Sequence, residues 1–161
     1  MKTLTATCAL LLALPVSAIA QSEAPTPGRQ LAEVIFGSIE DNPEGAADMG
    51  EFVKFGQEIF VSMDYDEDGS VDLGEFTDWD FGFNFIAEDE AQERAYETAQ
   101  KTLFAIWDHD GNGEIGRQEY HKSMMWDFRR ADTDDNALLT RDEFLSGYVV
   151  NLAYRAAITG R

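Results

Sequence analysis

Three twelve-residue segments of this chain place acidic or amide side chains at positions 1, 3 and 5 and a glutamate at position 12. They read DYDEDGSVDLGE at 64–75, DHDGNGEIGRQE at 108–119 and DTDDNALLTRDE at 132–143. A hard divalent cation such as calcium takes about six to eight oxygen ligands, and a loop that bends sharply at position 6 can supply them from positions 1, 3, 5, 7, 9 and 12. The spacing therefore predicts metal-binding loops.

Loop 64–75 fits this scheme best because it has an acid at each side-chain ligand position and Gly69 at the bend. Its candidate ligands are Asp64, Asp66, Asp68, the carbonyl of Ser70, Asp72 through a water, and both oxygens of Glu75. Loop 108–119 has fewer acids, with Gly113 at the bend and Gly116 leaving position 9 to water. Its candidate ligands are Asp108, Asp110, Asn112, the carbonyl of Glu114, and Glu119.

Loop 132–143 departs from the scheme at its bend, where Ala137 replaces glycine. An alanine pays a steric cost for positive φ, so we expect strain and a lower affinity there. The candidate ligands are Asp132, Asp134, Asn136, the carbonyl of Leu138, Thr140 and Glu143.

The same residues frame every loop. A phenylalanine precedes each loop by four residues, an aromatic follows each final glutamate, and an aliphatic residue holds position 8 (Phe60, Phe104, Phe128; Phe76, Tyr120, Phe144; Val71, Ile115, Leu139). This frame also surrounds 40–51 (EDNPEGAADMGE), between Phe36 and Phe52. Glu40 is one methylene too long for position 1 and Pro43 stiffens the loop, so we interpret 40–51 as divergent, with weak or no binding.

These motifs resemble the EF-hand family of calcium-binding proteins over most of the chain. The resemblance implies an all-α fold, a bundle of helix-loop-helix units with short β contacts between paired loops, with residues 29–161 forming the EF-hand domain. The 24-residue interval between loops within each half is similar to that of lanmodulin, a secreted bacterial EF-hand protein that prefers lanthanides. Lanmodulin loops carry proline at position 2, where this chain has Tyr65, His109 and Thr133.

The intervals between loops predict how the loops pair. Loop starts at 40, 64, 108 and 132 divide the chain into two halves offset by 68 residues. The twelve residues between the loops of one half form a helix about 18 Å long, which puts those loops at opposite ends. We therefore expect 64–75 to pair with 108–119 and 40–51 to lie near 132–143. The link 76–107 is expected to hold a helix, a turn near 82–90 and a second helix.

Apolar residues recur at helical spacing through the segments between the loops. The expected buried faces are Leu31, Val34, Ile35 and Ile39; Phe52, Phe55, Ile59, Phe60 and Met63; Tyr120, Met124, Phe128 and Ala131; and Phe144, Tyr148, Leu152 and Arg155 on one last helix from near Arg141. An aromatic run and a Met-rich stretch are interpreted as core, with a groove for a protein partner as the alternative (Phe76, Trp79, Phe81, Phe83, Phe85; Met124, Met125, Trp126).

Residues 1–20 have the layout of a secretory signal peptide, with Lys2, an apolar stretch at 9–16 and Ala-Ile-Ala at 18–20. Residues 21–28 are expected to be a flexible leader. Cleavage would remove Cys8 and one lysine, so the net charge would change from -19 to -20. We expect an exported, periplasmic or secreted protein whose acidity disfavours nucleic acid and, after signal removal, membranes.

Three functions remain open at this stage. The first is calcium binding by a sensor, a buffer or a calcium-stabilised interaction module. The second is lanthanide-selective binding, and the third is a metal-stabilised regulatory subunit of an enzyme. Catalysis by the chain itself is not expected, because His109 and His121 are its histidines and neither has a cysteine or placed nucleophile beside it. His109, at position 2 of its loop, is interpreted as a surface residue.

Overall fold

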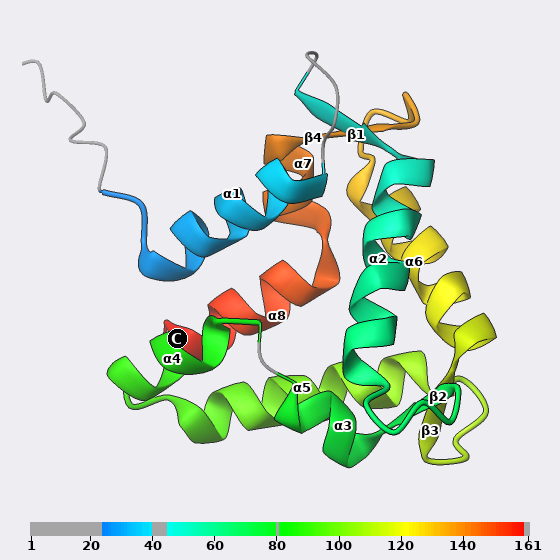
Figure 1. The fold of residues 1–161 in the computed structure, drawn as a ribbon. Coiled ribbons are helices and arrows are strands. Elements are labelled where there is room, and N and C mark those ends of the chain that lie inside the picture. The colour runs from blue at the N-terminus through cyan, green and yellow to red at the C-terminus, as the bar shows by residue number, and fades with distance from the viewer. Residues whose placement is uncertain (1–23, 40–44, 80, 160–161) are drawn as a thin grey trace, which may run out of the picture.

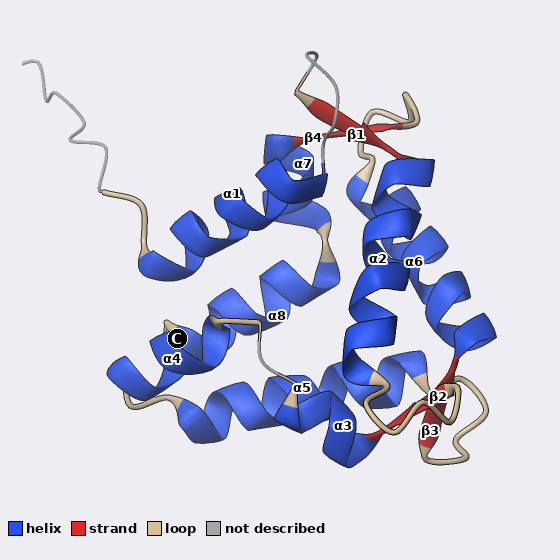
Figure 2. Cartoon of the chain, viewed as in Figure 1, coloured by secondary structure: helices blue, strands red, loops and turns tan. Residues whose placement is uncertain are grey.

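The computed structural model describes residues 24–39, 45–79 and 81–159, and this part of the chain is mostly helical (Figures 1 and 2). The expected signal peptide and the first five residues of loop 40–51 lie outside the described residues. The helices are α1 (Pro27–Ile39), α2 (Met49–Met63), α3 (Leu73–Asp78), α4 (Phe83–Asp89), α5 (Glu93–Trp107), α6 (Arg117–Ala131), α7 (Arg141–Gly147) and α8 (Val149–Ile158). The short strands are β1 (Ala46–Asp48), β2 (Ser70–Asp72), β3 (Glu114–Gly116) and β4 (Leu138–Thr140).

The strands form two antiparallel pairs, β1 with β4 and β2 with β3. Position 8 of one loop faces position 8 of its partner, since Val71 pairs with Ile115 and Ala47 with Leu139. All four side chains are buried. Each strand pair therefore joins its two loops by backbone hydrogen bonds and by contact between buried apolar side chains. The predicted pairing of the loops across the two halves is confirmed.

Helices α2 and α6 lie side by side and run in opposite directions, with one strand pair at each end (Figure 1). Edge-to-face contacts join them, with ring centroids 5.8 Å apart for Phe52 and Phe128 and 5.2 Å for Phe60 and Tyr120. The predicted apolar face of α6 is buried throughout. On α2, Phe52, Phe60 and Met63 are buried, while Phe55 and Ile59 pack at the edge of the core.

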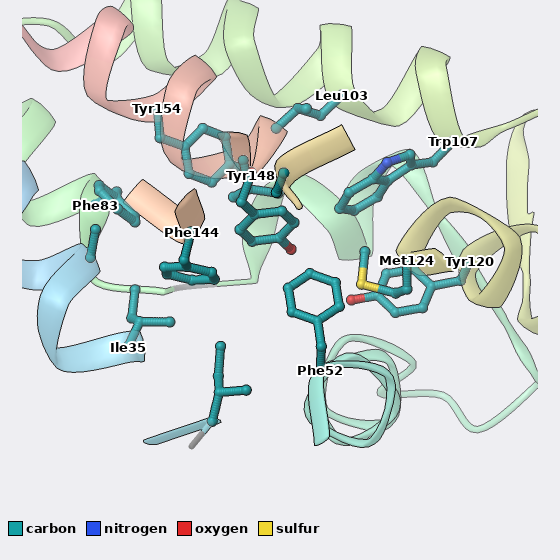
Figure 3. Close-up of a cluster of buried hydrophobic side chains, with 14 of the residues drawn as sticks. Ile35, Phe52, Phe83, Leu103, Trp107, Tyr120, Met124, Phe144, Tyr148 and Tyr154 are labelled. Carbon is teal, nitrogen blue, oxygen red and sulfur yellow. The ribbon is translucent and has the colours of Figure 1, made fainter. Parts of the chain in front are cut away.

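Aromatic rings dominate the core (Figure 3). Tyr148 lies between Phe144 and Phe52, with centroids 5.3 and 5.2 Å away. At the other end of the α2 and α6 pair, Trp107 meets Tyr120 edge-on at 5.4 Å. Residues on both sides of the loops therefore share one core, and this core holds the helices that flank each loop in place.

Segment 82–90 differs from the turn that we expected, because most of it forms helix α4. Gly82 precedes the helix with a φ of 89°, in the left-handed region that favours glycine. Phe83 and Ala87, four residues apart, are both buried, and the Phe83 ring meets Tyr154 of α8 at 5.5 Å. A side chain from a distant helix thus stabilises a helix that is too short to form alone.

The C-terminal segment forms two helices, so the expectation of one continuous helix was wrong. Tyr148 has extended backbone, with φ -69° and ψ 121°, and separates α7 from α8. The Asn151 side chain donates to the Phe144 carbonyl at 3.1 Å, and Arg155 donates to the Leu145 carbonyl at 2.8 Å. The Arg155 bond gives the Leu145 carbonyl a partner at the interruption, and the Asn151 bond is a second one for the Phe144 carbonyl, which also accepts the Tyr148 N–H at 3.2 Å. The break shifts the buried face, and Leu152 is consequently 45% exposed.

Two further expectations need correction near the N-terminus. Helix α1 begins at Pro27, inside the segment expected to be a flexible leader, and proline is favourable in the first turn of a helix. Val34 was expected on the buried face of this helix but is 71% exposed, while Ala32 and Phe36 are fully buried.

The aromatic run after loop 64–75 divides between core and surface. Phe76 and Phe83 are buried, Trp79 and Phe81 are half-buried and stacked at 4.8 Å, and Phe85 is exposed. In the Met-rich stretch Met124 is buried and Trp126 is exposed. None of the helices in the described ranges is long and apolar enough to cross a lipid bilayer.

Candidate metal centres

Each of the three predicted loops lies between two helices whose ends it shares. The leading helix stops one residue before position 1, yet the position-1 N–H still donates to the carbonyl of the phenylalanine four residues earlier. These bonds measure 3.0 Å from Asp64 to Phe60, 2.8 Å from Asp108 to Phe104 and 2.9 Å from Asp132 to Phe128. The first candidate ligand is therefore anchored to a buried aromatic residue, which explains the framing phenylalanines.

Acidic oxygens converge in every one of these loops. One carboxylate oxygen from each member of a group lies within 4.8 Å of the others in three groups: Asp64 with Asp66 and Asp68, Asp108 with Asp110 and Glu119, and Asp132 with Asp134 and Glu143. Glu75 is not part of the first group. Oxygen atoms gathered at this separation from at least three side chains could hold a metal ion.

The glutamate at position 12 folds back over its loop in the same way three times. One carboxylate oxygen accepts from the backbone N–H of position 2, at 3.1 Å for Tyr65 to Glu75, 2.8 Å for His109 to Glu119 and 3.0 Å for Thr133 to Glu143. The second oxygen accepts from the N–H of position 9 at 3.0, 2.9 and 3.0 Å, from Asp72, Gly116 and Thr140. At least two N–H bonds thus orient each of these carboxylates.

Inside each loop, side-chain oxygens accept the backbone N–H groups of the bend. The N–H of position 6 donates to the position-1 aspartate, at 3.3 Å for Gly69, 2.9 Å for Gly113 and 2.9 Å for Ala137. The N–H of position 7 donates to position 5 at 2.8, 2.8 and 2.7 Å, from Ser70, Glu114 and Leu138. The residues that donate these position-7 N–H groups are also the ones whose carbonyls are predicted ligands. Each is the first residue of its strand, β2, β3 or β4.

The bends use the left-handed backbone region at two positions, one of which the sequence analysis missed. At position 6, Gly69 has φ 95° and Gly113 has φ 92°, and Ala137 adopts φ 66°. Ala137 is therefore in the strained conformation that we predicted. Position 4 also has positive φ, at 60° for Glu67, 72° for Gly111 and 57° for Asp135. Gly111 and Asp135 tolerate this region, but Glu67 offers no sequence signal of it.

Position 9 caps the helix that follows the loop. Asp72 Oδ1 accepts from the Glu75 N–H at 2.8 Å, and Thr140 Oγ1 accepts from the Glu143 N–H at 3.3 Å. Together with the return bonds from the glutamates, these form capping boxes. The candidate ligand at position 12 is thus also the third residue of a capped helix. The cap fixes the start of the helix, and this holds the carboxylate over the loop.

Hydrogen bonds set the protonation of two acids. Burial alone raises the pKa of Glu143, but bonds from N–H and hydroxyl groups of Thr140 and Thr133 outweigh it and lower this pKa to about 2. Bonds from the Ser70 N–H and hydroxyl lower the pKa of Asp68. Both groups are carboxylates at neutral pH, as metal ligation requires.

Loop 40–51 is described from residue 45 onward. Gly45 has φ 70° at the bend, and Asp48 and Glu51 form the same capping box, with bonds of 2.8 and 2.9 Å. Glu40, Asn42 and Glu44, the expected occupants of positions 1, 3 and 5, lie outside the described residues. The second half of this loop therefore follows the common pattern.

Besides the strand pairing, two polar side-chain contacts join loops 64–75 and 108–119, and neither was expected from the sequence. Arg117 Nη2 lies 2.9 Å from Asp64 Oδ2, and the Ser70 hydroxyl, whose one proton is shared with Asp68 at 2.8 Å, lies 3.1 Å from Glu114 Oε2. The available signal was a basic residue at position 10 of the later loop, in a pair of loops whose candidate side-chain ligands are all acidic or amide.

His109 is half-buried, in contrast to the expected surface position. Its Nε2 lies 3.2 Å from the Ser123 hydroxyl, and its ring packs on Trp126 with centroids 5.2 Å apart. Ser123 itself is 2% exposed. This contact ties loop 108–119 to helix α6.

No protein-family model matches this sequence, and no curated protein matches it significantly. The arrangement of the three loops is accordingly interpreted from its own geometry.

Proposed function

We propose that this protein is an exported EF-hand protein that binds calcium through loops 64–75, 108–119 and 132–143. The observation that carries the proposal is the repetition of one hydrogen-bond network in all three loops, in which the position-12 glutamate accepts the N–H groups of positions 2 and 9. Chance acidic surface would not repeat this network at the same positions.

The chemistry of the donors favours a hard cation. Each acidic group contains oxygen donors alone, and histidine and cysteine are absent from these groups in the described residues. Calcium prefers carboxylates and carbonyls in a flexible loop, whereas zinc prefers nitrogen and sulfur. The ligands that we assign are those named from the sequence, with Asp64, Asp66, Asp68 and Glu75 in the most acidic loop.

Binding would also stabilise the protein. The chain has a formal charge of -19, and the groups within 4.8 Å repel one another as carboxylates. A cation that binds the folded state but not the unfolded one adds stability by mass action. We therefore propose a calcium-stabilised module, with sensor and buffer roles distinguished by whether calcium exposes apolar surface.

Lanthanide binding is the second candidate, favoured by the acids of loop 64–75, which converge as Asp64, Asp66 and Asp68. A trivalent ion gains more than a divalent ion from each added carboxylate. Competition between calcium and lanthanum, followed by helicity or by terbium luminescence excited through Tyr65, distinguishes the two candidates.

The test of the ligand assignment compares Glu75→Gln with Glu58→Gln in calorimetric calcium titration. Both substitutions remove one negative charge, but Glu58 is exposed on α2, away from the loops. We expect calcium stoichiometry to fall by one site in the Glu75 variant and to stay unchanged in the Glu58 variant. Equal stoichiometry in both variants would contradict the assignment, and absence of any bound calcium or lanthanum in the parent would contradict the proposed function.

A further inference from the structure

We propose that Arg117 sets the ion-charge selectivity of loop 64–75, and this inference rests on the proposed function. Arg117 belongs to loop 108–119, yet its guanidinium ends at the neighbouring loop, with Nη2 2.9 Å from Asp64 Oδ2. Asp64 is a candidate ligand of that loop, and its side chain is 2% exposed while that of Arg117 is 58% exposed. A permanent positive charge from one loop thus lies against the most buried acid of the other.

The position of the guanidinium is fixed by more than the ion pair. Its central carbon lies 5.0 Å from the centre of the Phe60 ring, within the range of a cation–π contact. Phe60 is the residue whose carbonyl anchors the Asp64 N–H at 3.0 Å. On the loop side, a Cβ added at Gly69 would lie 3.8 Å from Arg117 Nε. Arg117 is therefore held between the leading helix and the bend of loop 64–75.

Asp64 keeps one oxygen for other partners. Its Oδ2 is taken by Arg117, whereas its Oδ1 accepts the Gly69 N–H at 3.3 Å. The guanidinium thus orients the carboxylate without using both oxygens. Its positive charge reduces the attraction of the loop for any cation, in proportion to the charge of that cation.

The paired loop lacks the equivalent cation. Val71 and Ile115, which pair, are both at position 8 of their loops, so the two loops face each other symmetrically. Position 10 is Arg117 in loop 108–119 and Leu73 in loop 64–75. Leu73 is uncharged, and the ion pairs recorded among the described residues include none to Asp108. The two paired loops should therefore differ in their preference for ions of higher charge.

The size of the effect follows from Coulomb scaling. The repulsion between Arg117 and a bound ion is proportional to the charge of the ion. If this repulsion weakens affinity about threefold for each unit of ion charge, it weakens binding of a divalent ion about tenfold and of a trivalent ion about thirtyfold. Arg117 would then make loop 64–75 about threefold more selective for calcium over lanthanum than its acids alone would.

The experiment measures calcium and lanthanum affinity by calorimetry in Arg117→Gln, Arg117→Lys and Arg141→Gln. Terbium luminescence excited through Tyr65 reports on loop 64–75. Arg141 occupies position 10 of loop 132–143 and is a matched control, because it is also exposed and follows β4, a strand of the other pair. We expect Arg117→Gln to bind calcium about tenfold and lanthanum about thirtyfold more tightly at loop 64–75. At loop 64–75, the Arg117→Lys variant, which keeps the charge, and the Arg141→Gln variant should both stay close to the parent.

A merely structural role for Arg117 predicts a different result, since loss of a packing contact would weaken both ions equally. Equal shifts, no shift or a loss for both ions would overturn the inference while leaving calcium binding by the parent intact. The converse variant, Leu73→Arg, does not depend on the stability of Arg117→Gln. It should weaken loop 108–119, reported by luminescence through Trp107, more for lanthanum than for calcium, and an equal or absent change would also overturn the inference.

Discussion

Gly147 provides a sharp test of how the helices around loop 132–143 are packed. It is the last residue of α7 and is buried against Ala131, the last residue of α6. A Cβ at position 147 would lie 2.5 Å from Ala131 Cα and 2.8 Å from Ala131 Cβ. Carbon atoms in contact prefer about 3.5–4.0 Å, so Gly147→Ala requires the two helices to separate by about 1 Å.

The cost can be bounded from this geometry. Overpacking a core costs about 1–3 kcal/mol, and the upper part of this range applies because the obstructing atoms include backbone, which cannot rotate away. Replacing a helical glycine by alanine returns about 0.5–1 kcal/mol. We therefore expect Gly147→Ala to lose about 2 kcal/mol of unfolding free energy. Separation of α6 from α7 should also move Asp132 away from Glu143 and weaken ion binding at loop 132–143.

The assay is urea denaturation followed by helicity without calcium, together with calcium titration of each variant. Gly37→Ala is the matched control, because nothing lies within 4 Å of a Cβ added there, and it should gain about 0.5–1 kcal/mol. Gly56→Ala should fall between the two, since its nearest contacts at 2.8 Å are atoms of the flexible Met124 side chain. If Gly147→Ala is as stable as Gly37→Ala, the close approach of α6 and α7 is wrong.

Three further substitutions test the loops and the core. Ala137→Gly relieves a residue held at φ 66°. Left-handed backbone costs an L-residue about 1–2 kcal/mol, and the greater flexibility of glycine in the unfolded chain offsets about 0.4–1 kcal/mol of the gain. Denaturant unfolding without calcium should therefore show a net gain of about 0.5–1 kcal/mol, and a loss of stability would count against strain. Phe128→Ala should cost about 3–5 kcal/mol in denaturant unfolding, because the side chain is 1% exposed; a loss below half of that would mean that α6 is packed differently. For Asp127, burial raises the pKa from 3.8 to about 6, against the opposing effects of Arg130 and the Trp107 N–H. A raised carboxyl pKa means that the folded state loses stability as pH rises from about 4 to about 6. The unfolding free energy of Asp127→Asn should therefore gain up to about 3 kcal/mol relative to the parent across that interval. Parallel profiles of unfolding free energy against pH for the two proteins would show that Asp127 does not titrate in this way.

The local chemistry of the loops could be predicted from the sequence because ligand type and spacing act within twelve residues. Asp108, Asp110 and Glu119 were named as ligands from their positions, and the structure brings their oxygens together. Pairing of loops 64–75 and 108–119 was also predictable, since a twelve-residue helix is a rigid spacer that keeps neighbouring loops apart. The strain at Ala137 followed from the steric cost of a Cβ at positive φ.

Features that depend on distant partners could not be predicted in this way. Helix α4 exists because Phe83 meets Tyr154, a residue 71 positions later in the chain. At the break at Tyr148, side chains of α8 donate hydrogen bonds to carbonyls of α7. Arg117 and Asp64 are 53 residues apart and meet through the β2 and β3 pairing. Periodicity and ligand spacing describe residues that are neighbours along the chain. These contacts instead depend on where whole helices lie after packing, which short-range sequence patterns do not determine.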